Sequence, residues 1–343
     1  MLKVGLVGIG FMGRGHLDQY IRLEKEGADI KLVAICDVDP NKFKGIFTPG
    51  NMGSLGSNTY DFSKYHLYTD FDEMIANEEL DYVDMPLPTF LHCHYAVRAM
   101  EKGLNVLCEK PMALNPEQCN QMIQTAERTG KKLMIAQCLR FWPAYRIAKA
   151  YVDNGEFGKP VFGRFYRGGS TPAWSYQDWL RDESRSGGVL LDQHVHDVDT
   201  INYFFGMPDA VSTISHNYHL GAGTDAVSTH YRYENMVITA EDDWSQNGDG
   251  VNFKMTFLLN FERGSVEYDG VKTTVHPVGG KMFVADDGTT DDGYYNEIKY
   301  YTNCLENNLP IETAPLESTR DTIVIATAER ESAAKNGEWI SLK

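Results

Sequence analysis

Two side chains in the second half of the chain have the types and spacing of an acid–base pair. Asp192 and His196 lie four residues apart in an apolar stretch of helical period, so they share one face of the expected helix. A carboxylate one turn from a histidine orients the imidazole and stabilises its cation, which suits a general base. A surface Asp–His pair has the same spacing, so both interpretations stay open here.

A charged pair and a proline interrupt the chain directly after an apolar run. The run at residues 105–108 predicts a buried strand, and Glu109, Lys110 and Pro111 follow it at once. Taken alone, these three residues fit a lead into the next helix, with the proline ending the strand. Their types alone assign them no chemistry.

A glycine-rich turn follows the first predicted strand. Gly8 permits the tight turn, Gly10 lets the backbone approach a pyrophosphate, and Gly13 lets the following helix pack on the strand. The amino-terminal end of that helix offers unpaired N–H groups to phosphates. Asp37 ends the second predicted strand, where a carboxylate accepts hydrogen bonds from both ribose hydroxyls and repels a 2′-phosphate. The pattern favours NAD over NADP, although a plain strand-end aspartate is the alternative.

Two histidine pairs suggest a metal at first sight. His194 and His196, and likewise His92 and His94, are two residues apart in predicted helices. Side chains at this spacing diverge on a helix and do not chelate one ion. We therefore predict no metal site.

The surrounding elements alternate in the first half and change character after it. Continuous apolar strands separated by helical stretches predict a parallel sheet covered on both faces. Later runs alternate with period two, which predicts an antiparallel sheet with one covered face. The predicted fold class is an α/β Rossmann domain with a parallel sheet, plus an α+β domain on an open, mostly antiparallel sheet. We place the two domains at residues 1–138 and 139–343, with the C-terminal helix able to pack on the first.

A Gly-, Asn- and Ser-rich stretch at residues 45–65 interrupts the alternation and predicts a long loop. A tolerated surface insertion and a flap near the adenosine end of the cofactor are both compatible with this composition.

Composition excludes some partners. The formal charge of −16 over 343 residues disfavours binding to nucleic acid and to anionic membranes. The start of the chain does not have the pattern of a signal peptide, and no apolar run reaches the length of a membrane span. The six scattered cysteines are typical of reduced thiols, so we expect a cytoplasmic protein.

Four segments in order resemble the Gfo/Idh/MocA oxidoreductases, the family of glucose–fructose oxidoreductase and inositol dehydrogenases. They are the glycine turn with Asp37, then residues 86–111, 140–160 and 186–199, and the tail also looks like the family's. The resemblance implies that Glu109-Lys110-Pro111 lies beside the nicotinamide at a strand end. It further implies that Lys110 contacts the reacting hydroxyl, with Asp192 and His196 as the family's aspartate and base.

The expected activity is NAD-dependent hydride transfer from a secondary hydroxyl of a sugar or cyclitol. The expected catalytic residues are Lys110, Asp192 and His196. The expected cofactor contacts are Gly8, Gly10, Phe11, Met12, Gly13, Asp37, Pro86, Leu87, Pro88, His92 and Glu109. The expected substrate contacts are Lys110, Arg167, Trp174, Trp179, Asp192 and His196, in a cleft between the domains.

One motif departs from the family pattern, and the substrate and two alternative functions stay open. The family's Thr-Pro-Asn turn is Leu87-Pro88-Thr89 here, with His92 retained. Inositol is not specified by the substrate-end residues. A catalytically silent sugar or dinucleotide sensor, and an enzyme that recycles a tightly held cofactor, are the alternatives. If its exposed sheet face is apolar, the protein is expected to form a homodimer or homotetramer.

Overall fold

The computed structural model describes residues 1–47, 58–218, 223–246 and 251–343, which group into two compact units. The first unit holds residues 1–138, 173–179 and 294–320, and the second holds residues 139–172, 180–293 and 321–343. Most of the loop predicted at 45–65 lies outside the described residues, so neither interpretation of it is tested. Each unit is described on its own.

The first unit is built on a parallel sheet with the strand order β3-β2-β1-β4-β5-β6. Its described strands are β1 (Leu2–Val7), β2 (Ile30–Cys36), β3 (His66–Tyr68), β4 (Tyr82–Met85), β5 (Asn105–Glu109) and β6 (Leu133–Ala136). The order reverses direction at β1, and right-handed crossovers therefore place successive helices on opposite faces. The carboxyl ends of β1, β4 and β5 consequently lie at one edge of the sheet.

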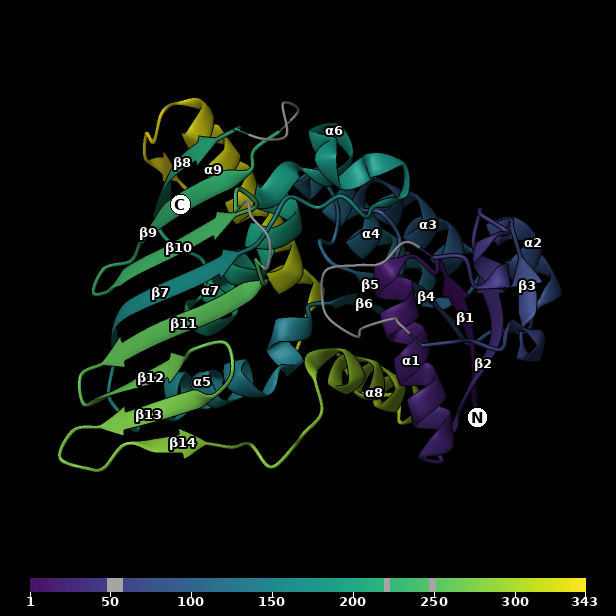
Figure 1. Cartoon of the computed structure of the whole chain (residues 1–343), viewed down its shortest axis with the longest axis horizontal. Helices are drawn as coiled ribbons and strands as arrows, with labels where there is room; N and C mark the ends of the chain where they lie inside the picture. Colours follow the sequence, from purple (N-terminus) through teal and green to yellow (C-terminus); the bar gives the residue numbers. More distant parts are fainter. Residues whose placement is uncertain (48–57, 219–222, 247–250) are drawn as a thin grey trace. The chain divides into compact units, whose positions relative to one another are not determined.

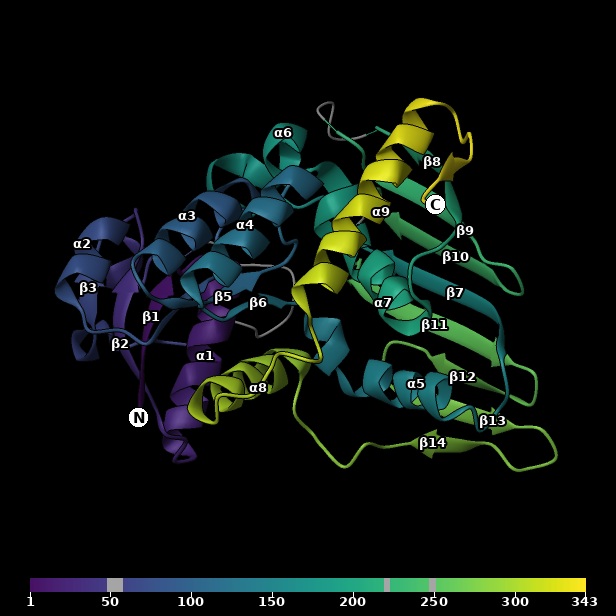
Figure 2. The same cartoon turned by 180° about the vertical axis from the view of Figure 1, so that it is seen from behind.

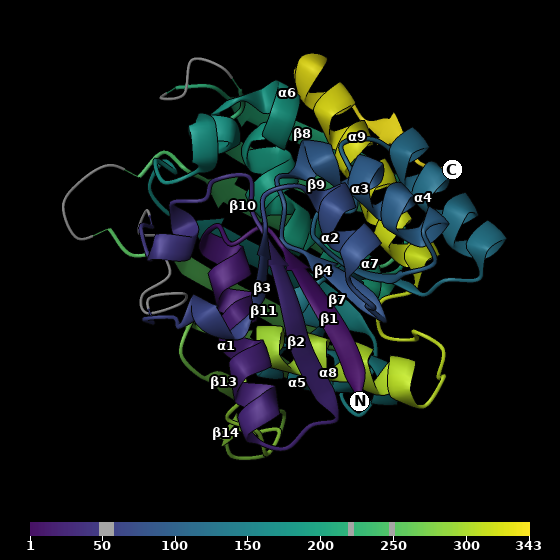
Figure 3. The same ribbon diagram turned by 90° about the vertical axis from the view of Figure 1, so that its right-hand side faces the viewer.

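Helices cover both faces of this sheet, which explains why its strands are apolar throughout. The helices are α1 (Phe11–Lys25), α2 (Phe71–Asn77), α3 (Thr89–Glu101), α4 (Pro116–Thr129) and α8 (Gly293–Glu306). Figure 3 shows α1 on one side of the strands and α3 on the other. The sequence sets these helix ends locally: the Asn115 side chain accepts the Gln118 N–H at the start of α4, and Gly130 ends α4 in the left-handed region.

The second unit is built on a mixed sheet with the order β14-β13-β12-β11-β7-β10-β9-β8-β15. Its strands are β7 (Pro160–Gly168), β8 (Ala210–His216), β9 (Ala226–Arg232), β10 (Val237–Asp243), β11 (Lys254–Phe261), β12 (Gly264–Tyr268), β13 (Thr273–Pro277), β14 (Phe283–Ala285) and β15 (Ile340–Ser341). The pair β7–β10 is parallel and the other pairs between described strands are antiparallel. Together the two sheets confirm the predicted fold class.

One face of the second sheet is covered and the other is not. Helices α5 (Pro143–Asn154) and α7 (Val195–Phe205) lie on the covered face, as does the part of α9 (Leu316–Ala334) that belongs to this unit (Figures 1 and 2). In the described part of the chain no helix covers the opposite face, where the Arg164–Glu241 ion pair lies beside the exposed Val237. This face is chemically mixed, and the expected oligomer stays a prediction.

The prediction of a regular helix around Asp192 and His196 is wrong in one detail. A short helix α6 (Glu183–Ser186) ends at Gly187, and a π-helical segment η5 (Leu190–His194) precedes α7. A π turn holds more than four residues, so it changes which side chains face the core. Both Gly187 and Gly188 adopt positive φ, a conformation that glycine takes without strain.

The six cysteines are all buried thiols, as the sequence predicts for reduced residues. Among the described residues, no helix combines the length and the apolar character that crossing a membrane requires.

Candidate active site

The glycine turn between β1 and α1 has the geometry that the sequence predicts. Gly8 has a φ of 94°, and a Cβ on Gly13 would lie only 1.9 Å from the Gly8 carbonyl oxygen. A Cβ on Gly10, in contrast, would meet no atom within 4 Å. Gly10 therefore faces open space at the amino-terminal end of α1, where a pyrophosphate could approach the backbone. Phe11 and Met12 follow it, both half-buried in the first turn.

Asp37 lies directly after β2 and is connected to the glycine turn. Its Oδ2 accepts the Ile9 N–H at 2.8 Å, and its Oδ1 accepts the Asp39 N–H at 2.9 Å. The Lys42 ammonium lies 2.7 Å from the same Oδ2, and its side chain is largely buried. Sequence reasoning found Asp37 but overlooked Lys42, whose signal was only a lysine five residues downstream.

The turn after β4 and the segment after β5 are joined by one buried histidine. His92 has no exposed surface, and its ring nitrogens lie 2.8 Å from the carbonyl oxygens of Pro111 and Leu87. Pro86 is buried, whereas Leu87 and Pro88 are half-exposed at the sheet edge. The structure thus gives His92 a supporting position, and its predicted contact with the cofactor stays a prediction.

Glu109 and Lys110 end β5 at the same sheet edge. Glu109 is 4% exposed, and its Oε2 accepts the Lys110 backbone N–H at 2.9 Å. Lys110 is half-exposed, in contrast to the fully buried Cys108 before it. A cationic side chain therefore lies on the edge where an open α/β sheet binds its ligand.

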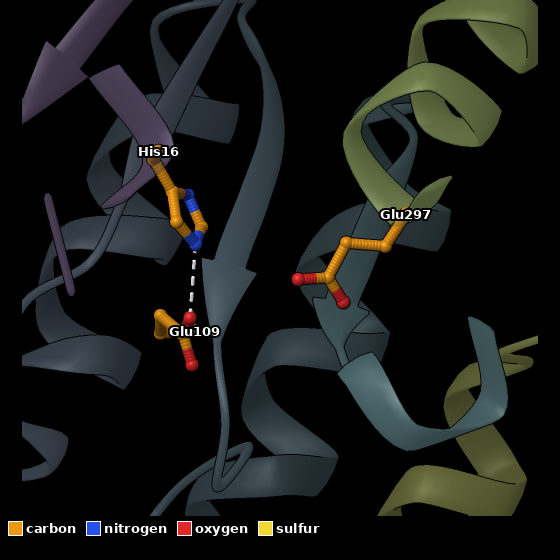
Figure 4. Close-up of side chains that lie close together, drawn as sticks. All are labelled: His16, Glu109 and Glu297. Atoms are coloured by element: carbon orange, nitrogen blue, oxygen red, sulfur yellow. Dashed lines mark hydrogen bonds and ion pairs between the residues drawn. The ribbon is translucent and has the colours of Figure 1, made fainter. Parts of the chain in front are cut away.

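A buried ionisable cluster lies behind Glu109. His16 on α1 places Nδ1 2.8 Å from Asp84 Oδ2 and Nε2 3.0 Å from Glu109 Oε1. Figure 4 shows His16, Glu109 and Glu297, the last extending from α8 toward the other two. The sequence analysis overlooked this cluster, and its one available signal was an aspartate at position 84 inside an otherwise apolar strand.

The same cluster is the arrangement, among the described residues, that a metal ion could use. Donor atoms of His16, Glu109 and Glu297 all lie within 4.8 Å of one another. Both ring nitrogens of His16 already face carboxylate oxygens at hydrogen-bonding distance. Protons on the two nitrogens satisfy these contacts, so we propose no metal here.

In the second unit, the π segment and α7 alternate between buried and half-exposed side chains. Asp192 and His196 are half-exposed, whereas Gln193, His194 and Val195 between them are buried. Asp192 and His196 therefore share the more accessible side, as the predicted helical spacing requires. Each keeps a polar or electrostatic contact within the protein.

Arg167 was predicted to contact substrate, but it lies in the interior of the second unit. It is 2% exposed and donates from Nη2 to Asp197 Oδ1 at 3.0 Å. Although burial lowers the pKa of Arg167, the charge of Asp197 raises it above its ordinary value. Reaching a ligand would break this buried ion pair, so the structure gives Arg167 a structural position.

Trp174 and Trp179 are half-buried on the segment that groups with the first unit. The segment ends in the 3-10 helix η4 (Tyr176–Arg181). The tryptophan faces offer the apolar surface on which sugar C–H groups pack, but ordinary packing explains the half-burial equally well.

Considered separately, the two units offer different chemistry. The first presents a glycine turn with open space at Gly10, the carboxylate of Asp37 and the lysine Lys110 at one sheet edge. The second presents a histidine with a carboxylate on its accessible helical side. Such groups can bind a dinucleotide, stabilise an alkoxide and accept a proton.

Family models match both units of the chain. Residues 2–137 match an oxidoreductase family with an NAD-binding Rossmann fold, and residues 145–267 match the GFO/IDH/MocA C-terminal domain.

Several curated proteins are similar in sequence. A 2,7-anhydro-N-acetylneuraminate hydratase from Mediterraneibacter gnavus is 28% identical over 62% of this chain and 53% of its own. A D-apiose dehydrogenase from Paraburkholderia graminis is 27% identical over 70% of this chain and 60% of its own. An inositol 2-dehydrogenase/D-chiro-inositol 3-dehydrogenase from Lactiplantibacillus plantarum is 28% identical over 57% of this chain and 50% of its own. The chain thus spans about half to three fifths of the length of these relatives.

Solved structures of similar fold cover the chain almost completely. A levoglucosan dehydrogenase bound to NADH and levoglucosan has a TM-score of 0.84 at 22% identity, over 99% of each chain. An Agrobacterium radiobacter oxidoreductase bound to NAD+, L-tartaric acid and magnesium has a TM-score of 0.82 at 21% identity, over 99% of this chain and 98% of its own. At these identities the likeness shows the shared fold.

Proposed function

Because the chain belongs to the GFO/IDH/MocA oxidoreductase family, we propose that it oxidises a secondary hydroxyl of a sugar or cyclitol with NAD. The observation that carries this proposal is the position of Lys110. It lies at the carboxyl end of β5, on the same sheet edge as the glycine turn and Asp37. A dinucleotide held at that edge would place its reacting ring near this cation.

The proposed roles follow from the chemistry of each group. Bound NAD would accept a hydride from the carbinol carbon, which is the cofactor's own chemistry. His196 accepts the hydroxyl proton, and Asp192 orients its imidazole and stabilises the cation. Lys110 stabilises the alkoxide that develops as the hydride leaves.

The residues proposed to bind the cofactor fit an NAD-type dinucleotide. Gly10 leaves space at the amino-terminal end of α1 for a pyrophosphate, and Oδ1 of Asp37 can accept a further hydrogen bond, from a ribose hydroxyl. The relatives named for D-apiose and inositol dehydrogenation, and the levoglucosan dehydrogenase of similar fold, support a polyhydroxylated substrate. We propose Trp174 and Trp179 as candidates for its apolar contacts.

The proposal is tested by incubating the protein with NAD and a panel of aldoses, polyols, anhydrosugars and cyclitols while NADH absorbance is recorded. We expect steady turnover with at least one member. NADH binding without turnover of any member would instead favour the sensor alternative. A redox-neutral change of substrate without released NADH would favour the recycling alternative, which the similarity to a hydratase makes worth assaying.

A further inference from the structure

His16 is a buried ionisable residue that the proposed chemistry does not use. It lies on α1 with no exposed surface, and it contacts carboxylates from two strands. Asp84, on the neighbouring strand β4, also has no exposed surface and accepts a second hydrogen bond, from Tyr20, at 2.8 Å. The Tyr20 hydroxyl in turn accepts from Tyr82 at 3.2 Å.

Both ring nitrogens of His16 must donate in this arrangement. Ionised carboxylates only accept hydrogen bonds, and each nitrogen faces one at 2.8 or 3.0 Å. Although burial lowers the pKa of His16, the charges of Asp84 and Glu109 raise it well above its ordinary value. His16 is therefore an imidazolium between two carboxylates at neutral pH.

Glu109 connects this imidazolium to Lys110. Its Oε1 is held by His16, and its Oε2 accepts the Lys110 backbone N–H. Burial raises the pKa of Glu109, but the hydrogen bond and charge of His16, together with the charge of Lys110, bring it below its ordinary value. Glu109 thus stays ionised beside a cation that attracts it.

Removing the Nε2 donor would disturb both the ionised state and the orientation of Glu109. One buried carboxylate oxygen would lose its partner, which is costly in a dry interior. Glu109 would then take up a proton or turn toward another donor. Either change removes the charge, or the geometry, that acts on Lys110.

We propose that His16 is a positioning residue, which fixes Glu109 and, through the hydrogen bond and the charge of Glu109, the position of Lys110. This inference rests on the proposed function, because it gives His16 a role in hydride transfer without contact with the substrate. It also gives the two ring nitrogens different roles. Nε2 holds Glu109 and so acts on Lys110, whereas Nδ1 stabilises the fold through its contact with Asp84.

Two amide substitutions distinguish the nitrogens. The amide nitrogen of glutamine can take the position of Nε2, whereas that of asparagine can take the position of Nδ1. We expect His16→Gln to lower kcat by no more than about tenfold, because it loses the imidazolium charge but keeps a hydrogen-bond donor to Glu109. We expect His16→Asn to lower kcat by roughly 10- to 100-fold, a loss typical of a misplaced catalytic group.

Cofactor binding and a matched control separate positioning from unfolding. NADH affinity, measured by fluorescence, should change by no more than about threefold in either variant, since neither touches the glycine turn or Asp37. Tyr20→Phe removes the other donor to Asp84 and should leave kcat unchanged. Equal losses of kcat in His16→Gln and His16→Asn would overturn the proposal.

A second readout needs no substrate. Reductive methylation of Lys110, followed by peptide mass spectrometry, is compared with that of the exposed Lys102. We expect His16→Asn to change the Lys110 rate at least about threefold relative to Lys102, because Glu109 no longer holds the segment that presents this lysine. His16→Gln should change the Lys110 rate less than His16→Asn does, and identical rates in all three proteins would contradict the inference.

If His16→Asn fails to fold, Glu109→Gln decides the matter. It keeps the shape of the side chain but removes the charge, so we expect the same change in Lys110 labelling and a similar loss of kcat. Unchanged labelling in this variant overturns the proposal. A protein that turns over no panel substrate rejects the proposed function, while the labelling experiment still decides the role of His16.

Discussion

Asp37 and Lys42 form the ion pair that we expect to set cofactor choice. The carboxylate should repel a 2′-phosphate, while the ammonium 2.7 Å away moderates that repulsion. Replacing Asp37 by serine and the exposed Val38 by arginine should therefore move the preference from NADH toward NADPH by roughly tenfold or more. The measurement is the ratio of the two dissociation constants.

Lys42→Ala is the matched variant that should shift the cofactor preference in the opposite direction. Removing the ammonium should sharpen the preference for NADH by roughly threefold to tenfold, as expected for one partly buried ion pair. If both variants keep the wild-type ratio, the adenosine ribose does not bind at Asp37.

His196 is expected to act in the chemical step and not in cofactor binding. His196→Ala should lower kcat by ~10²–10⁴-fold, the usual contribution of a positioned general base. NADH affinity should remain, because the groups proposed to bind the cofactor belong to the other unit. The exposed His276 on β13 offers the control, since His276→Ala should change neither quantity. Near-normal kcat in His196→Ala would remove it from the catalytic residues.

The β1–α1 junction allows a test at the level of elements, because two glycines there have opposite surroundings. A Cβ on Gly13 would collide with the Gly8 carbonyl, whereas a Cβ on Gly10 would meet nothing within 4 Å. Gly13→Ala should therefore destabilise the fold by about 1–3 kcal/mol, in the range of an overpacked contact. Gly10→Ala should keep the melting temperature but weaken NADH binding, because its methyl group enters the space proposed for the pyrophosphate. Equal changes of the melting temperature in Gly13→Ala and Gly10→Ala would contradict the different surroundings assigned to these two glycines.

His194 connects three elements of the second unit and should make stability depend on pH. Its Nδ1 lies 2.5 Å from Asp242 on β10, and its Nε2 lies 3.4 Å from Glu329 on α9. Burial lowers the pKa of His194, but Glu329 and Asp242 raise it to about 10. An ordinary histidine titrates near 6.5, so only the folded state holds this proton between the two values.

The free energy of unfolding should therefore fall as pH rises from about 7 to 10, by at most ~1.4 kcal/mol per pH unit from this group. This contribution is fully present below the unfolded pKa and is lost as pH rises through the folded one. His194→Gln should show a shallower decline than the wild type in denaturant titrations. Parallel pH curves for the two proteins would show that His194 is not charged in the fold.

Elements with a local signal could be predicted from the sequence. The strand–helix alternation and the glycine turn depend on neighbouring residues, and the structure confirms them. The π segment before α7 could not be predicted, because the apolar residues at 189–191 and 195 fit either helical period. The cluster of His16, Asp84 and Glu109 could not be predicted either, because its members come from three elements that only the folded structure brings together.

For the whole molecule, the proposed reaction requires residues from both units. The first supplies the groups proposed to bind the dinucleotide and Lys110, while the second supplies Asp192 and His196. The sequence predicted these residues through its resemblance to a family, and spacing alone left a surface pair as an alternative. The half-exposed positions of Asp192 and His196 agree with the proposed roles.

The central claim is that a hydride passes from a carbinol carbon of the substrate to the nicotinamide. Its most direct test uses the panel substrate with the highest turnover, deuterated at the carbon that is oxidised, and records the mass of the NADH formed. The account predicts NADH that carries the deuterium, formed by the wild type and, at a rate lowered by roughly 10²–10³-fold, by Lys110→Ala. NADH without deuterium, or equal rates in the two proteins, would contradict it.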